Sequence, residues 1–148
     1  MDKKIFSKKI NRIPINDGFF TMPLDPLDQV RLRGSHCRVC DEVFLGRRLS
    51  CENCGSEDLD EKVLSKRGKL YTYTIIEHRP AGDYKGPDPF IPFGLGLVEL
   101  LEGFRIVAPL TENDPMQLKI GMELELVIDK LFDDEEGNEV IAFKFRPL

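Results

Sequence analysis

The chain has few of the residues on which nucleophilic catalysis depends. Its 148 residues include two histidines, His36 and His78, and four cysteines. The four cysteines all fall within residues 37–54. A catalytic nucleophile needs a neighbouring histidine, or a second cysteine, that acts as acid and base. The sequence shows no partnered Ser-His-Asp arrangement, and we expect all four cysteines to be committed to a metal ion. We therefore expect no catalysis by this chain alone.

Long apolar runs are absent as well. No stretch reaches the roughly 18 apolar residues of a membrane-spanning helix. The N-terminal segment MDKKIFSKKINRIP has basic residues but lacks the apolar core of a signal peptide. These absences predict a soluble, cytoplasmic protein with no membrane partner.

An excess of positive charge is also missing. The formal net charge is −5, so the overall field repels phosphate backbones and argues against nucleic acid as the default partner. With 41% hydrophobic residues in 148, the chain can bury one core. That length allows one domain, or a compact domain with a small module, and excludes a larger multidomain enzyme.

The four cysteines form two pairs of equal spacing in CRVCDEVFLGRRLSCENC. Cys37 and Cys40 make one Cys-x2-Cys, and Cys51 and Cys54 make the other. Each pair can occupy a tight turn that points two sulfurs at one tetrahedral ion, and Gly55 suits such a turn because it adopts positive φ. Reducing cytosol preserves few disulfides but permits metal–thiolate bonds. We predict a zinc site, and iron in a rubredoxin-like site stays open.

This site is expected to be structural. Four thiolates fill the tetrahedron and leave no position for water or substrate. A redox role would use one Cys-x-x-Cys at a helix start and would leave the second pair unexplained. Because the tetrad is complete, we do not expect His36 to be a ligand. We expect His78 to be solvated or hydrogen-bonded rather than a catalytic base.

The chain divides into three expected regions. Residues 1–33 form an N-terminal arm, partly helical near PLDPLDQVRL. Residues 34–61 form the zinc ribbon, and residues 62–148 form a β domain. The apolar residues Phe19, Phe20, Met22 and Leu24 of the arm either cover the domain or dock onto another chain.

Five strands are predicted in the β domain. They are KLYTYTIIEH, the two apolar runs of FGLGLVELLEGFRIVAPL on either side of a Glu102-Gly103 turn, MELELVIDKLF and VIAFKFRPL. A short helix or turn is expected after Asp114, with Pro115 at its first position. Five short antiparallel strands with this connection predict an OB-fold barrel. The fold class is thus mainly β: arm, rubredoxin-like zinc ribbon and five-stranded OB-fold barrel.

Alternation in the last three strands predicts which side chains face inward. They are Phe104, Ile106, Ala108, Leu110; Met122, Leu124, Leu126, Ile128; and Ile141, Phe143, Phe145.

An ordered set of motifs resembles a known family. A proline-rich arm precedes CxxC and R-x-x-CxxC. The motif G-x-L-x-x-Y-T (Gly68, Leu70, Tyr73, Thr74), a proline-rich loop, G-L-V-E-L-x-E-G, I-G-M and F-x-F-x-P follow. From about residue 20 to the C-terminus this order is similar to that of the zinc-ribbon/OB-fold acyl-CoA-associated proteins.

The resemblance implies an accessory role. Members of that family are accessory subunits of thiolase-fold enzymes. One archaeal member holds a thiolase against hydroxymethylglutaryl-CoA synthase, and another is the small subunit of benzoylsuccinyl-CoA thiolase in anaerobic toluene degradation. The expectation is a non-catalytic, zinc-binding subunit of a thiolase-type acyl-CoA enzyme, in a hetero-oligomer that shares a CoA ester. The loop after the first strand and the acidic last hairpin favour a dedicated bacterial thiolase subunit, and the resemblance implies toluene-type degradation as one setting for it.

Contact residues are predicted in the loop HRPAGDYKGPDPFIPF. Tyr84 and Lys85 at its tip suit polar contact, and a lysine binds CoA phosphates as a point charge. Phe90, Ile91 and Phe93 form an apolar wall for an acyl chain or a partner. Alternatively, Phe93 starts the next strand as core and Phe90 caps the barrel.

Two further candidates, Arg47 and Arg48, lie between the cysteine pairs. Their donors suit a partner carboxylate or a CoA phosphate, and a solvated loop charge is the alternative. The family usually has Pro-Pro-Arg here, so Gly46 and Arg47 of LGRR depart from its pattern while Arg48 matches it.

Two other functions stay open. One is a free-standing acyl-CoA-binding protein. The other is a single-stranded nucleic-acid module with Tyr71 and Tyr73 as stacking platforms, against which the acidic balance argues.

Overall fold

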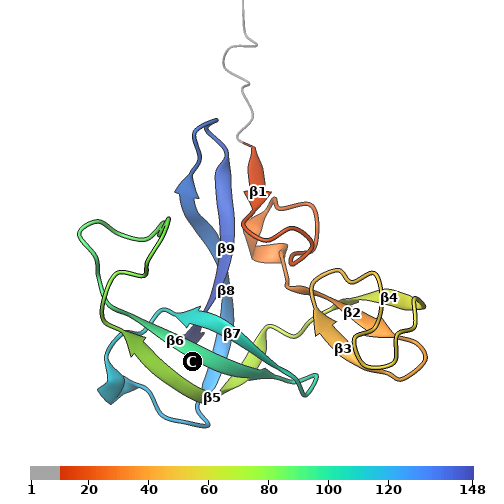
Figure 1. Ribbon diagram of the computed structural model, residues 1–148. Helices are drawn as coiled ribbons and strands as arrows, with labels where there is room; N and C mark the ends of the chain where they lie inside the picture. The colour runs from red at the N-terminus through yellow and green to blue at the C-terminus, as the bar shows by residue number, and fades with distance from the viewer. Residues whose placement is uncertain (1–10) are drawn as a thin grey trace, which may run out of the picture.

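The structure is a computed structural model that describes residues 11–148. A three-stranded ribbon lies beside a six-stranded sheet that closes into a barrel (Figure 1). The first ten residues of the arm, with most of the basic N-terminal segment, fall outside the described part. Within that part no helix is long and apolar enough to cross a membrane.

The barrel consists of the five predicted strands. They are β5 (Arg67–Ile76), β6 (Phe93–Leu100), β7 (Arg105–Leu110), β8 (Glu123–Asp133) and β9 (Glu139–Pro147). The strand order β9-β7-β6-β5-β8, with a further pairing of β8 and β9, closes the ring. The predicted OB-fold barrel is confirmed.

One detail of the predicted barrel is wrong. The strands are not all antiparallel, because β7 and β9 pair in parallel through Leu110 and Phe145. The chain leaves β7 through the 3-10 helix η3 (Pro115–Gln117), crosses the barrel in β8, and returns in β9 beside β7. Asp114 caps η3 as expected, since its side chain accepts the Met116 N–H at 2.9 Å.

The barrel interior follows the predicted alternation on β7 and β9. Ile106, Ala108 and Leu110 are buried, as are Ile141 and Phe145. Side chains that face into the closed sheet lose their contact with water, which stabilises the fold by roughly 25 cal/mol per Å² of apolar surface.

Strand β6 also alternates, with the buried Val98 and Leu100 at inward positions. Its inward positions include Gly94 and Gly96. A Cβ at Gly96 would lie 3.0 Å from side-chain atoms of both Leu110 and Leu70, and one at Gly94 would lie 2.6 Å from the Glu112 carbonyl oxygen. The barrel is too narrow for larger residues there. The large side chains of β6 include Leu95 and Leu97 on the outer face.

The arm packs on its own chain. Strand β1 (Arg12–Pro14) pairs in parallel with β9, and η2 (Leu27–Gln29) is the single helical turn found in the predicted stretch. Phe20 and Leu24 are buried, with Phe20 edge-on to Phe143 at 6.1 Å between ring centroids, whereas Met22 is exposed. The arm was expected either to cover the domain or to dock onto another chain. Phe20 and Leu24 cover the domain.

The ribbon is formed by β2 (Arg33–Cys37), β3 (Val43–Leu45) and β4 (Leu59–Val63), in the order β3-β2-β4. Both outer strands pair antiparallel with β2. The backbone of Leu64 donates to Leu32 at 2.9 Å, which ties the end of the ribbon to the arm.

An ion-pair cluster on β8 predicts a pH effect. The Glu125 carboxylate accepts a 2.6 Å hydrogen bond from Arg146 and lies near Arg67 and Lys66, so the pKa of Glu125 is lowered from its ordinary 4.5. A lowered folded-state pKa stabilises the protein above the unfolded pKa, and this contribution is lost as pH falls through the folded value. We expect Glu125→Gln to flatten the decline in unfolding free energy below about pH 4.5, measured by urea denaturation. The control is Glu123→Gln on the same strand, and equal slopes in wild type and Glu125→Gln would contradict the prediction.

Candidate metal centre and adjoining cavity

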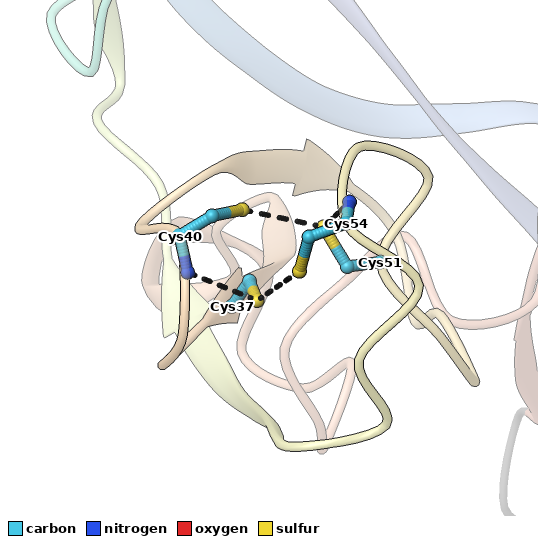
Figure 2. A group of neighbouring side chains, drawn as sticks. All are labelled: Cys37, Cys40, Cys51 and Cys54. Carbon is cyan, nitrogen blue, oxygen red and sulfur yellow. Dashed lines mark hydrogen bonds between the residues drawn. The ribbon is translucent and has the colours of Figure 1, made fainter.

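The four cysteines converge on one point of the ribbon. Their Sγ atoms all lie within 4.8 Å of one another (Figure 2). Cys37 Sγ lies 3.6 Å from Cys54 Sγ, and Cys40 Sγ lies 3.5 Å from Cys51 Sγ. A tetrahedral zinc ion with Zn–S bonds of about 2.3 Å requires sulfur–sulfur distances of about 3.8 Å. The sulfur positions therefore fit a four-coordinate ion.

The two cysteine pairs adopt matching turns. The N–H of Asp41 donates to the Cys37 carbonyl, and that of Gly55 to the Cys51 carbonyl, both at 2.9 Å. Asp41 and Gly55 both have positive φ, 67° and 80°. In each pair the first sulfur accepts the N–H of the second cysteine, at 3.5 and 3.4 Å. Asp41 was missed from the sequence, although its position after the first pair corresponds to that of Gly55.

The crowded thiols need a cation. The pKa of Cys40 is lowered to about 7, chiefly because the Asn53 side chain donates to its sulfur. The pKa of Cys54 is raised to about 12: the Ser56 backbone lowers it, but burial and the neighbouring sulfurs outweigh that effect. A bound dication favours all four thiolates at once. The cluster fits a structural zinc ion held by the four cysteines.

His36 lies between two carboxylates. Its Nδ1 lies 3.0 Å from an Asp60 oxygen, and its Nε2 lies 3.0 Å from an Asp41 oxygen. These carboxylates, Asp41 before Asp60, raise the pKa of His36. The two contacts link β2 to β4 and to the first cysteine turn. His78 is exposed.

A cavity of about 570 Å³ adjoins the barrel. Residues of the β5–β6 loop and of the β8–β9 hairpin line it, and both segments extend from the barrel in Figure 1. The predicted residues Tyr84, Lys85 and Phe93 line it. The other lining residues are Ile15, Asn16, Phe19, Leu45, Asp83, Gly86, Pro87, Val107, Pro109, Leu110, Asp129, Lys130, Leu131, Ala142, Phe143 and Lys144.

Aromatic contacts organise the loop. Tyr84 stacks on Phe93 with 6.2 Å between centroids and an angle of 9°, and lies edge-on to Phe90 at 5.7 Å. Phe90 thus supports the wall without lining the cavity, and Ile91 is exposed outside it. Lys85 pairs with Asp83 at 3.1 Å.

The ribbon arginines do not join this group. Arg48 contacts Glu52, donates to the Leu45 carbonyl at 3.2 Å and lies over the Phe44 ring. Arg47 is more exposed and lies 3.8 Å from an Asp17 oxygen. Neither lines the cavity, so the structure separates them from Tyr84, Lys85 and Phe93. Their role in partner contact stays a prediction.

Several cavity residues were missed from the sequence. Ile15 and Phe19 come from the arm, Leu45 from the ribbon, and Lys144 from the last strand. Only the docking of arm and ribbon on the barrel brings them together. Val107 could have been recognised from the sequence as a surface contact residue, because it is apolar and stands at an outward position of its predicted strand.

Family models match both parts of the described chain. Residues 24–60 match "ChsH2, rubredoxin-like zinc ribbon domain", and residues 61–129 match "ChsH2, C-terminal OB-fold domain". A "DUF35 domain-containing scaffold protein" of Pyrococcus furiosus is 37% identical over 123 residues, which cover 82% of this chain and 86% of the relative. The chain belongs to the ChsH2/DUF35 family.

Other family members extend this comparison. "Benzoylsuccinyl-CoA thiolase subunit BbsA" of Thauera aromatica is 30% identical over 117 residues, or 79% of this chain and 76% of the relative. The solved structure titled "Ltp2-ChsH2(DUF35) aldolase" superposes with a TM-score of 0.61 at 30% identity, and covers 79% of this chain and 84% of that one. The suspected zinc-ribbon/OB-fold family is confirmed.

Proposed function

We propose that this chain is a non-catalytic, zinc-stabilised subunit of a thiolase-type acyl-CoA enzyme complex. The observation that carries the proposal is the closed tetrad, which commits all four cysteines to one site. Among residues 11–148 the side-chain hydrogen bonds of histidine run only from His36 to carboxylates. In this part of the chain neither histidine is hydrogen-bonded to a serine, threonine or cysteine side chain, which supports a binding role. The relatives named as scaffold and thiolase subunit support the same role.

The cavity supports a part in CoA-ester binding. Its volume lies in the range of roughly 300–1,000 Å³ that is usual for small-molecule sites. Phe19, Phe93 and Phe143 give it an apolar wall. Lysines and carboxylates both line it, and Lys144 is the lining lysine that forms no ion pair within residues 11–148, since Lys85 pairs with Asp83 and Lys130 with Asp133. We assign the acyl group to the wall and an anionic part of the ester to the lysines, while the partner subunit supplies the chemistry. The aromatic wall favours an aromatic acyl group, as in toluene-type degradation.

The thiolate site supports a cytoplasmic location for the complex. Metal-bound thiolates persist in a reducing compartment, whereas an oxidising one favours disulfides.

Purification from the native host tests the proposed function. We expect the tagged chain to bring down one thiolase-type subunit at fixed stoichiometry, identified by mass spectrometry. We expect acyl-CoA thiolysis by the pair and none by the chain alone. A wild-type chain that retains no thiolase-type protein, or that catalyses thiolysis by itself, would overturn the proposal.

A free-standing acyl-CoA-binding protein is the second candidate, favoured by the cavity itself. Calorimetric titration of the isolated chain with benzoyl-CoA separates the two. Tight binding without a partner supports the carrier, while binding that appears only in the complex supports the subunit.

The two tyrosines considered as stacking platforms for nucleic acid are already in contact with other side chains. Tyr71 points outward, but the Arg105 guanidinium carbon lies 3.7 Å from its ring centroid. Tyr73 packs against the core. A base therefore finds no pair of free aromatic faces on β5.

A further inference from the structure

The outer face of β6 and β7 is apolar where a solvated sheet face is polar. Leu95 and Leu97, both half-buried, lie on the outer face because they alternate with the inward residues Gly94, Gly96 and Val98, and their register partners on β7 are Pro109 and Val107. We call these four residues the outer ridge. None of them packs in the core, and Val107 is 61% exposed. An antiparallel sheet with one solvated face alternates apolar and polar residues, so the outer ridge departs from the rule for a free surface.

The outer ridge is continuous with the cavity. Two residues of the outer ridge, Val107 and Pro109, also line the cavity. Phe93, which precedes the ridge on β6, lines the cavity as well. A body that covers the ridge therefore also reaches the mouth of the cavity. Contiguous apolar surface of this kind marks interaction sites on soluble proteins.

Cations without carboxylate partners border this surface. Arg105 lies at the β7 end of the ridge and stacks on Tyr71, although Glu99 is its cross-strand neighbour. Lys144 lines the cavity at the other end. Among residues 11–148 neither Arg105 nor Lys144 forms an ion pair with a carboxylate. Glu99 opposite Arg105 and Asp129 in the cavity lining are carboxylates of the same border, and the charge that complements its two unpaired cations is negative.

A second copy of the chain fits this surface poorly. An isologous contact would place the Arg105 end of one ridge against the Lys144 end of the other. Cations would then meet across an apolar contact, which costs free energy. A different protein with carboxylates around an apolar segment meets no such repulsion.

We propose that the outer ridge is the docking surface for the enzyme subunit, and that this subunit presents an apolar segment flanked by carboxylates. The inference rests on the proposed function and names the surface that performs it. Docking here sets the partner against the mouth of the cavity, so that a ligand in the cavity lies between the two subunits.

The test uses the full chain and the thiolase-type subunit purified with it. We expect Leu97→Glu/Val107→Glu to raise the dissociation constant at least ~10-fold, as loss of central apolar contacts does in protein interfaces. The control is Met116→Glu/Ile120→Glu, which adds the same charge at two exposed apolar residues of the η3 region. Arg105→Glu should also weaken binding, and Arg105→Lys should retain it.

A second measurement does not depend on the stability of the variants. A photo-crosslinking residue at position 107 should join the partner, and the same residue at position 120 should not. Undiminished binding by the ridge variant, or crosslinks only from position 120, overturns the docking surface while leaving the proposed function intact. A wild-type chain that binds no thiolase-type subunit overturns both. A wild-type homodimer that Val107→Glu converts to monomer assigns the ridge to self-association and overturns the inference.

Discussion

Replacing Cys51 by serine releases the metal and unfolds the zinc ribbon. Cys51 is buried and its sulfur also accepts the N–H groups of Asn53 and Cys54. Zinc binding contributes on the order of 10–16 kcal/mol in small zinc peptides, and a three-stranded ribbon has little apolar core to replace that free energy. We expect wild type to bind one zinc per chain by elemental analysis. The variant should bind none and lose the ribbon in a separate unfolding transition.

The control for this experiment is the exposed neighbour Ser50→Ala. It should bind metal and unfold as wild type does. Chelation of the wild-type metal should reproduce the effect of Cys51→Ser. A Cys51→Ser protein with full metal content and an unchanged transition would contradict a four-thiolate structural site. The same analysis decides between zinc and iron.

Replacing Phe145 by alanine should destabilise the barrel by about 3–5 kcal/mol, the usual cost of removing a buried phenylalanine. Phe145 is fully buried on β9, opposite Leu126 of β8, and it pairs with Leu110 of β7 where the barrel closes. The loss comprises the burial of the ring and the cavity that it leaves. It is large beside the roughly 5–15 kcal/mol total stability of a domain.

Urea denaturation of the zinc-loaded protein measures this effect. The adjacent Lys144→Ala is the control because that side chain lies outside the core cluster. A decrease of less than about 1 kcal/mol for Phe145→Ala would be below the range for large-to-small core substitutions and would show that closure does not depend on the ring.

Local patterns made the strands and the metal site predictable. Alternation of apolar residues places Ile106, Ala108 and Leu110 on one face of any extended chain, and they are buried in the barrel. Two Cys-x2-Cys turns bring Cys37 and Cys54 together over a short loop, so their sulfurs meet without help from the rest of the fold.

The sequence identified the loop as a candidate contact region but not which of its side chains line the cavity. The loop 78–93 was recognised as a candidate contact region, but its residues separate in space. Tyr84 and Phe93 line the cavity, Phe90 supports them, and Ile91 lies outside. Side-chain direction in a long loop depends on packing that no local period encodes.

The sequence alone determined the strand positions and the tetrad, because each arises from a short-range period or spacing, and the number and order of the strands indicated the OB-fold barrel. The tertiary structure decided the rest. The parallel pairing of β7 and β9 depends on the path of β8. The place of Leu97 on the outer face depends on the register of β6, in which Gly96 and Val98 face inward. The cavity exists because arm, ribbon and hairpin meet beside the barrel. These features arise from contacts between distant segments, and a single chain's local pattern carries no record of such contacts.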